Sequence, residues 1–283
     1  MAPTAKSLIL DLLSTLAGGT MPVSALVRAG ELFGIAENSL RVALARLVAA
    51  GQVERDERGR YRMGRQAAPI DRRVTSWRRL AERIRPWADR WVGVHTAGIA
   101  ARASDRQAQR RERALRFLGF GELTPGLSVR PDNLKGGIPA IRAELQSLGV
   151  EAGVLVFEID ALDAATDARA RSLWDVSGLC AGYRASLADI EASERHLQLV
   201  TEAECMVESF LLGGRVIRQL VLDPLLPDPI VPVGERDALV AAMRRYDRLG
   251  RACWATFLEG HGVLGSRTPA DTRIGDDASR LLN

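Results

Sequence analysis

The first quarter of the chain carries a closely spaced series of helix and strand patterns, and this series constrains the fold more than any other feature. Apolar residues recur at helical spacing over residues 6–17 and again over residues 24–33. Ser24 is placed to cap the second of these helices, and Gly34 supplies a tight turn after it. We therefore predict two short helices that precede a turn and a third helix.

The third helix starts near Glu37 and ends at Gly51, and its faces differ in character. Its apolar residues recur at helical spacing and form one stripe: Leu40, Ala43, Leu44, Leu47 and Val48. The remaining residues fall mainly on other faces of the helix: Asn38, Ser39, Arg41, Val42, Ala45 and Arg46. One side of the helix is therefore expected to pack against the fold, and the other is expected to contact a partner.

Two short strands follow this helix, at residues 52–55 and 60–63. The turn between them, Asp56–Gly59, is charged and ends in a glycine, where the backbone needs conformational freedom. The hairpin is predicted to form a wing beside the third helix. The order of these elements predicts an amino-terminal winged helix-turn-helix domain.

The predicted third helix has side chains that suit contact with the base edges of DNA. The major groove admits an α-helix, and arginine can then pair with guanine edges and asparagine with adenine edges. We predict that this helix contacts DNA through one set of residues: Asn38, Ser39, Arg41, Val42 and Arg46. The hairpin residues Arg58, Arg60 and Arg62 are better placed to neutralise phosphates or to enter a minor groove. The alternatives are a solvated helix face beside an unrelated hairpin, and a winged helix that binds another protein.

Arginine is concentrated in one part of the chain, although the net charge is only +4. Between Arg55 and Arg90, arginines follow one another with few acidic residues between them, which favours a polyanionic partner. Hydrophobic residues make up 47% of the chain and charged residues 26%, as in ordinary globular proteins. This composition argues against a wholly disordered chain.

The sequence also limits the expected compartment and the cysteine chemistry. No apolar stretch approaches the roughly 20 residues that cross a bilayer, and no signal-peptide pattern opens the chain. We therefore predict a cytoplasmic protein with no membrane partner. Cys180, Cys205 and Cys253 are widely separated, so we predict that they are reduced and mostly buried.

After the hairpin, strand and helix patterns alternate and then give way to helices. Strand patterns at 91–95, 127–130 and 152–159 alternate with helix patterns at 104–118 and 138–148, which suggests a ferredoxin-like domain. We predict an α+β protein in five segments: a winged-helix domain at 1–64, a helical connector at 65–90, a ferredoxin-like middle domain at 91–163, a helical carboxy-terminal domain for dimerisation or effector binding at 164–265, and a flexible tail at 266–283.

Residues with catalytic or metal-binding chemistry are scattered along the chain. The three histidines lie far apart and have no ligand partner at metal-binding spacing: His95, His196 and His261. The segment 118–123 begins like a glycine phosphate loop but lacks its third glycine, so we interpret it as a turn. Acidic pairs such as Asp160 with Asp163 lie beside helix starts, where capping is common. We therefore predict no catalytic residue, no metal site and no cofactor.

Four segments of the sequence resemble signatures of a single family, in the order that the family shows. They are Phe33–Gly51, which contains the predicted reading helix, Arg83–Trp91, Leu173–Asp175 and Leu222–Pro227. On these segments the chain resembles the PaaX family of bacterial repressors, known for controlling phenylacetate catabolism, over nearly its whole length. The resemblance implies a homodimer on double-stranded operator DNA and release by an aromatic acyl-coenzyme A such as phenylacetyl-coenzyme A. No effector-contacting residue can be matched between the family and this sequence.

Other interpretations stay open. Arginines in and before the helix pattern at 104–118 could meet the phosphates of a coenzyme: Arg102, Arg106, Arg110, Arg111 and Arg113. On a helix they could equally form a solvated face or extend the DNA-binding surface. A rival function is a metal-dependent nuclease that acts through the ferredoxin-like domain, because such folds also occur in nucleases. The sequence has no acidic cluster near Trp91–His95 to hold a metal, which favours the repressor.

Overall fold

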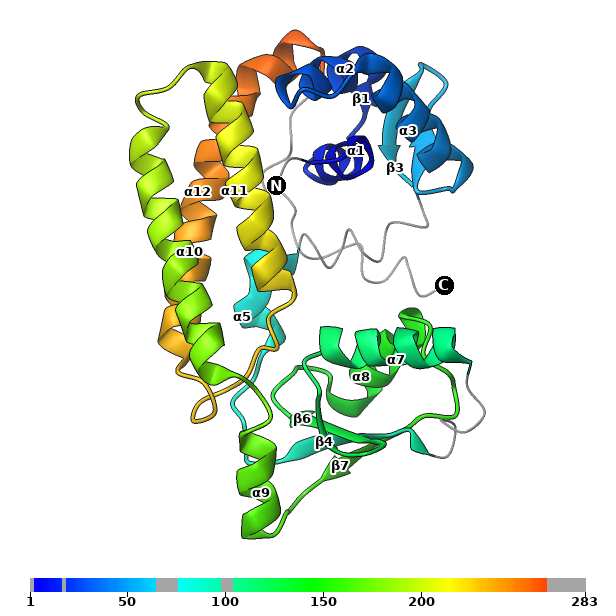
Figure 1. The fold of residues 1–283 in the computed structure, drawn as a ribbon, viewed down its shortest axis with the longest axis vertical. Helices are drawn as coiled ribbons and strands as arrows, with labels where there is room; N and C mark the ends of the chain where they lie inside the picture. The colour runs from blue at the N-terminus through cyan, green and yellow to red at the C-terminus, as the bar shows by residue number, and fades with distance from the viewer. Residues whose placement is uncertain (1–2, 17–18, 65–75, 98–103, 264–283) are drawn as a thin grey trace. The chain divides into compact units, whose positions relative to one another are not determined.

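The computed structural model describes residues 3–16, 19–64, 76–97 and 104–263. Their fold is α+β, as predicted, because helices occur together with two small antiparallel sheets. The chain divides into two compact units (Figure 1). Unit 1 contains residues 1–75, 194–214 and 246–283, and unit 2 contains residues 76–193 and 215–245.

Unit 1 begins with three helices and a three-stranded sheet. In chain order these elements are α1 (Ala5–Ser14), β1 (Met21–Pro22), α2 (Val23–Leu32), α3 (Glu37–Ala49), β2 (Val53–Arg55) and β3 (Arg60–Met63). The strand order is β1-β3-β2, and both pairs are antiparallel. The three helices and the hairpin were predicted. The strand β1 was not, because two residues are too few to show an alternating pattern.

The core of unit 1 joins segments that lie far apart in the sequence. Leucines such as Leu8, Leu26 and Leu40 are buried among α1, α2 and α3. Met206 and Trp254, which lie far later in the sequence, belong to the same apolar cluster. The amino-terminal helices are therefore packed against the carboxy-terminal helical residues of unit 1.

The start of α2 differs from the prediction. Pro22 occupies the cap position and forms no side-chain cap bond, and the helix begins at Val23. The predicted cap, Ser24, therefore lies inside the first turn, so the prediction was wrong. Proline suits the entry to a helix because it has no backbone N–H that would need a partner.

Unit 2 contains a four-stranded sheet with two helices. The elements are β4 (Trp91–His95), α7 (Asp105–Phe117), β5 (Gly121–Thr124), β6 (Leu127–Pro131), α8 (Gly137–Ser147) and β7 (Leu155–Ile159). The strand order is β5-β6-β4-β7, and every neighbouring pair is antiparallel. Val92 and Val94 of β4 pack with residues of α7 and α8, so both helices cover one face of the sheet (Figure 1).

Two strand predictions in this sheet need correction. The segment 118–123 was interpreted only as a turn, but β5 begins within it at Gly121. The turn itself is formed at Gly119, whose positive φ of 77° favours glycine. The strand predicted to start at residue 152 starts at Leu155, because residues 151–154 form a turn.

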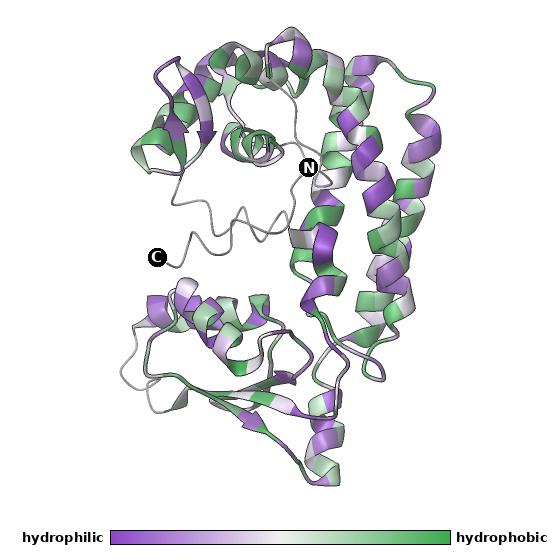
Figure 2. Ribbon diagram, turned by 180° about the vertical axis from the view of Figure 1, so that it is seen from behind, coloured by the Kyte–Doolittle hydropathy of each residue, from purple (hydrophilic) through white to green (hydrophobic). Residues whose placement is uncertain are grey.

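Helices make up most of the remaining described chain. The connector contains η1 (Ser76–Arg79) and α5 (Leu80–Arg83), and the later helices are α9 (Ala164–Arg171), α10 (Val176–His196), α11 (Glu202–Val221) and α12 (Val233–Gly260). Hydrophilic and hydrophobic residues alternate along the long helices (Figure 2). Among the described residues, no helix combines the length and the hydrophobicity that crossing a membrane requires. The predicted tail at 266–283 lies outside the described residues.

A buried polar network connects the sheet of unit 2 to the loop after α11. Arg130 of β6 is 1% exposed, and it donates to the carbonyls of Leu118 and Pro224. Asn133 donates to the carbonyl of Leu225 at 2.6 Å. Because these carbonyls have no strand partner, the side chains satisfy backbone groups that burial would otherwise leave unpaired.

The same loop is held from α10 by a second buried contact. The hydroxyl of Tyr183 donates to the carboxylate of Asp223 at 2.5 Å, and the guanidinium of Arg236 lies 3.8 Å from the same carboxylate. Burial raises the pKa of both Tyr183 and Asp223. Tyr183 therefore stays protonated and able to donate.

The cysteine prediction was wrong for two of the three residues. Cys205 of α11 and Cys253 of α12 form a disulfide, with their Cα atoms 5.9 Å apart. The two cysteines are 48 residues apart in the sequence, but the segments of α11 and α12 that carry them both belong to unit 1. Cys180 is buried and free, as predicted.

Removing the hydroxyl at Tyr183 should destabilise the fold. In Tyr183→Phe the buried Oδ2 of Asp223 loses the hydroxyl donor, although the backbone N–H of Leu225 still donates to Oδ1, so we expect the free energy of unfolding to fall by about 1–3 kcal/mol. The matched control is Arg215→Ala, which breaks an ion pair with Asp189 whose partners are 57% and 48% exposed. That change should cost less than about 1 kcal/mol. Urea unfolding of both variants measures the difference, and equal losses would contradict the role of Tyr183.

Candidate nucleic-acid interface

The helix α3 turns its polar side away from the core of unit 1. Leu40, Leu44 and Leu47 are buried. The residues predicted to read DNA are all exposed: Asn38, Ser39, Arg41, Val42 and Arg46. Even the apolar side chain of Val42 is 42% exposed. Unit 1 therefore leaves this face of α3 open to a partner.

The two arginines of this face differ in whether a carboxylate pairs with them. Arg41 donates to the carboxylate of Glu37 at 2.7 Å, and both side chains are more than half exposed. Such an exposed pair is weak, so Arg41 can exchange Glu37 for another acceptor at little cost. Arg46 is exposed, and no carboxylate pairs with it among the described residues.

The approach of α2 to α3 positions this face. A Cβ atom on Gly30 would lie 2.7 Å from Cδ1 of Leu40, so glycine permits the two helices to pack closely. Gly34 between them has a φ of 70°, which other residues rarely adopt. The sequence predicted the turn at Gly34, but the close contact at Gly30 depends on the tertiary packing.

The tip of the β2–β3 hairpin is shaped by Asp56. Its carboxylate accepts the backbone N–H groups of Arg58 and Arg60 at 3.0 and 2.7 Å. Gly59 completes the turn with a φ of 74°. The side chain of Arg58 is exposed, and within the described ranges it has no ionic partner.

The other two arginines of the hairpin are engaged. Arg60 donates to the hydroxyl and the carbonyl of Thr20 at 2.8 and 2.9 Å, and to the carbonyl of Gly262 at 2.9 Å. Arg62 pairs with Glu54 across the strands at 3.0 Å and is 53% exposed. In the structure Arg58 is therefore exposed and can contact a partner, and Arg62 is in an ion pair on the surface. Arg60 instead holds segments of unit 1 together.

Sequence reasoning missed the side chains that support α2 from the carboxy-terminal half of unit 1. The ring of Phe33, at the end of α2, lies 5.1 Å from the ring of Phe210, which in turn lies 5.9 Å from Trp254. These rings lie on helices predicted from their own periodicity, which carries no information on which helix packs against α2.

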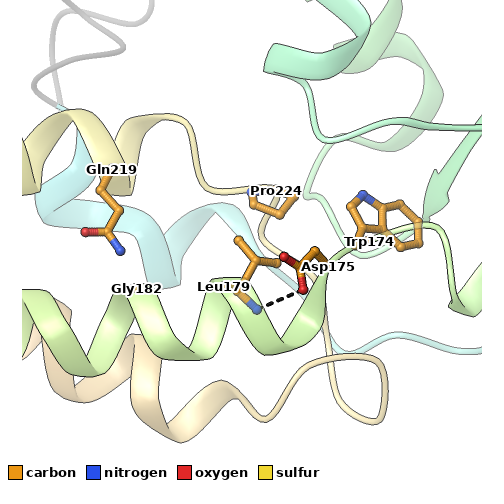
Figure 3. A pocket seen from close by; sticks show the side chains of 7 residues that line it. Trp174, Asp175, Leu179, Gly182, Gln219 and Pro224 are labelled. Atoms are coloured by element: carbon orange, nitrogen blue, oxygen red, sulfur yellow. Dashed lines mark hydrogen bonds between the residues drawn. The ribbon is translucent and has the colours of Figure 1, made fainter.

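A separate pocket of about 430 Å³ lies in unit 2 and is mostly apolar (Figure 3). It is lined by Trp174, Asp175, Gly178, Leu179, Gly182, Gln219 and Pro224. Asp175 accepts the N–H of Gly178 and the hydroxyl of Ser177, and these bonds hold its pKa below the ordinary value. Asp175 therefore caps the start of α10, and its carboxylate is engaged in these two bonds.

The arginines of α7 are not equivalent. Arg111 is buried and pairs with Glu151 at 3.1 Å, so it stabilises unit 2. Arg106, Arg110 and Arg113 are exposed. Arg102 lies outside the described residues. A polyanion could therefore reach only part of the arginine set that the sequence suggested.

Two of the three histidines make contacts within unit 1. His196 contacts Glu208 at 2.7 Å, and His261 contacts the carbonyl of Phe257 at 2.8 Å. Within the described ranges, no three histidine, cysteine, aspartate or glutamate side chains gather as a metal site would require.

The comparisons with known proteins match part of the chain to a family and most of it to a solved structure. The profile of the PaaX-like protein family matches residues 4–66. The fold is similar to that of the uncharacterized protein Rv0674 from Mycobacterium tuberculosis, with 28% sequence identity and a TM-score of 0.60. That match covers 88% of this chain and 98% of the other. No curated protein matches the chain.

The matched segment contains α1, α2, α3 and the β2–β3 hairpin, and so it includes every residue predicted to contact DNA. The resemblance to the PaaX-like family is therefore confirmed, and residues 4–66 of this chain carry it.

Proposed function

We propose that this protein is a transcriptional regulator that binds double-stranded DNA through a winged helix-turn-helix domain at residues 1–64. The observation that carries the proposal is the open face of α3 beside the exposed Arg58 of the hairpin, within the segment that matches the PaaX-like family. Transcription regulation is the activity that this family match supports.

In this proposal α3 lies in the major groove. Its exposed residues then face the base edges, where Arg46 and Arg41 suit guanine and Asn38 suits adenine. The hairpin would follow the neighbouring backbone, and Arg58 at its tip would neutralise a phosphate. Arg62 could join it by releasing Glu54, because that pair is exposed.

We further propose that residues 91–163 form a ferredoxin-like domain and residues 164–265 a helical domain. The strand order β5-β6-β4-β7 with two helices on one face supports the first assignment. The predominance of helix after β7 supports the second. Such domains are larger than DNA docking requires, and their extent favours a role in dimerisation or effector binding.

The finer proposal is a homodimeric repressor that an acyl-coenzyme A releases, in control of aromatic-acid catabolism. A two-fold dimer would place two copies of α3 in successive major grooves, with half-sites about 10–10.5 base pairs apart or near a multiple of that spacing. The exposed arginines of α7 are candidate partners for the phosphates of the coenzyme. Release requires that the ligand bind more tightly to the conformation that does not fit the operator.

Arg46→Ala should reduce sequence-specific binding. Fragments of bacterial genomic DNA retained by the purified protein would identify the operator and its half-site spacing. On these fragments Arg46→Ala should lose about 1–3 kcal/mol of binding free energy, as expected for a lost guanine contact. Lys6→Ala is the matched control, because it removes one exposed charge from α1 instead of α3.

The selection also separates the competing functions. Retention of no fragment would contradict the regulator and favour a module that binds proteins. Cleavage of the fragments in Mg²⁺ or Mn²⁺ that persists after repurification would instead favour a nuclease. Sedimentation of the protein as a monomer, both free and on a full operator, would contradict the dimer.

The two hairpin arginines should respond differently to substitution. Arg58→Ala should weaken binding to all duplexes and reduce the slope of log K against log salt by roughly one unit, with little change in stability. Arg60→Ala should lower the unfolding midpoint, because its guanidinium holds Thr20 and Gly262. Salt-dependent binding and thermal unfolding of both variants measure the contrast. Identical behaviour of the two would show that this division of roles is wrong.

The effector proposal predicts reciprocal coupling between ligand and DNA. Phenylacetyl-coenzyme A and benzoyl-coenzyme A should bind more weakly to the protein on its operator than to the free protein, and each should weaken operator binding by the same factor. Titration calorimetry with and without operator measures both, and free coenzyme A is the control. Equal affinity for the thioesters in the presence and absence of DNA would exclude this mechanism.

A further inference from the structure

The disulfide between Cys205 and Cys253 joins the two helices that complete the core of unit 1. Cys205 lies in the first turns of α11, and Cys253 lies near the end of α12. Both residues are partly exposed, so a small thiol or the active site of a reductase can approach the bond. The third cysteine, Cys180, is buried in unit 2 and does not take part.

The neighbours of both cysteines lie in the core. Met206 and Trp254, the next residue after each cysteine, are buried. The indole N–H of Trp254 donates to the carbonyl of Met206 at 3.1 Å, so a hydrogen bond joins the same two helices one residue from the disulfide. The spacing of α11 and α12 is therefore set at this level by one covalent bond and one polar contact.

Aromatic rings connect this part of α11 and α12 to α2, which precedes the helix predicted to contact DNA. Trp254 packs against Phe210, and Phe210 packs against Phe33. Phe33 is the C-cap residue of α2, directly before the turn at Gly34 that leads into α3. A change in the spacing of α11 and α12 would therefore alter the support beneath the turn that positions α3.

We propose that the Cys205–Cys253 disulfide is a redox switch that sets the affinity of the protein for DNA. The inference rests on the proposed function, because a protein that binds chromosomal DNA works in a compartment where thiols are kept reduced. Disulfides in such compartments are usually transient and regulatory. The oxidised form holds α11 and α12 together and keeps α3 in one orientation. In the reduced form α3 samples more orientations. Binding to DNA must then fix the helix in one of them, and the entropy lost in this ordering lowers the affinity for DNA.

The reductant is a dithiol. One of its thiolates attacks a sulfur of the Cys205–Cys253 bond and forms a mixed disulfide, and the other cysteine leaves as a thiolate that takes up a proton. The second thiol of the reductant then attacks the mixed disulfide, loses its proton and releases the remaining cysteine. Two electrons pass to the protein, which gains two thiols, and the dithiol becomes a cyclic disulfide.

The test compares the oxidised and the dithiothreitol-reduced full-length protein. Alkylation followed by mass spectrometry should find Cys205 and Cys253 protected only in the oxidised form. Hydrogen exchange should be faster in α2 and α3 after reduction. Affinity for the selected operator fragments should fall about tenfold, within the usual range for coupled sites. A reduced protein with unchanged exchange in α2 and α3 and unchanged affinity would overturn the proposal, as would two cysteines that stay reactive after oxidation.

Variants separate the switch from general effects of reductant. The double variant Cys205→Ser/Cys253→Ser should behave as the reduced form in both buffers, whereas Cys180→Ser should respond like the natural chain. Loss of the response in Cys180→Ser would overturn the assignment to this pair. If the double variant does not fold, the comparison of the two states of the natural chain still decides.

The two proposals fail in different ways. A protein that binds no duplex in either state contradicts the proposed regulator, and with it the effect of the switch on DNA affinity. Hydrogen exchange would then still show whether the disulfide controls the order of α2 and α3. Normal operator binding that does not depend on the redox state contradicts only the switch.

Discussion

Apolar packing between the amino-terminal helices and the later helices α11 and α12 is the interaction on which unit 1 depends. The helices α1, α2 and α3 bury Leu8 and Leu40 in a cluster that also contains Met206 and Trp254. Each large apolar side chain that is fully buried contributes about 1.5–3 kcal/mol. Residues 1–64 alone would leave the surface beneath Met206 and Trp254 exposed. The amino-terminal segment that resembles a known family is thus completed by residues that its profile does not cover.

A second constraint operates in unit 2, where tryptophans and buried polar groups hold separate segments together. Trp91 of β4 is parallel to Trp174 with ring centres 6.3 Å apart, and its indole donates to Asp167 of α9. Arg130 and Asn133 bind carbonyls of the loop that follows α11. Segments 83–91, 173–175 and 222–227, which lie outside the family match at residues 4–66, therefore have structural roles within the same unit.

The arginines show how the fold divides one residue type between structure and surface. Arg130 and Arg236 are buried, and Arg60 is bound by three hydrogen bonds inside unit 1. Arg46 and Arg58 remain exposed beside the candidate interface. A count of arginines along the sequence is therefore larger than the number of arginines that a polyanion can reach. The candidate interface is defined by the smaller set of arginines that the fold does not use.

Local patterns in the sequence predicted the three amino-terminal helices, the hairpin and the exposed face of α3, because neighbouring residues decide which side of a helix is apolar. The same patterns predicted strand β4 and placed Asp163 at a helix start, where it caps α9. The pairing of distant segments became visible only in the folded chain. The Cys205–Cys253 bond, the contact between Phe33 and Phe210, and the hydrogen bond from Arg60 to Gly262 all join residues far apart in the chain. Such contacts depend on how helices and strands pack, and a local pattern carries no record of the partner that covers it.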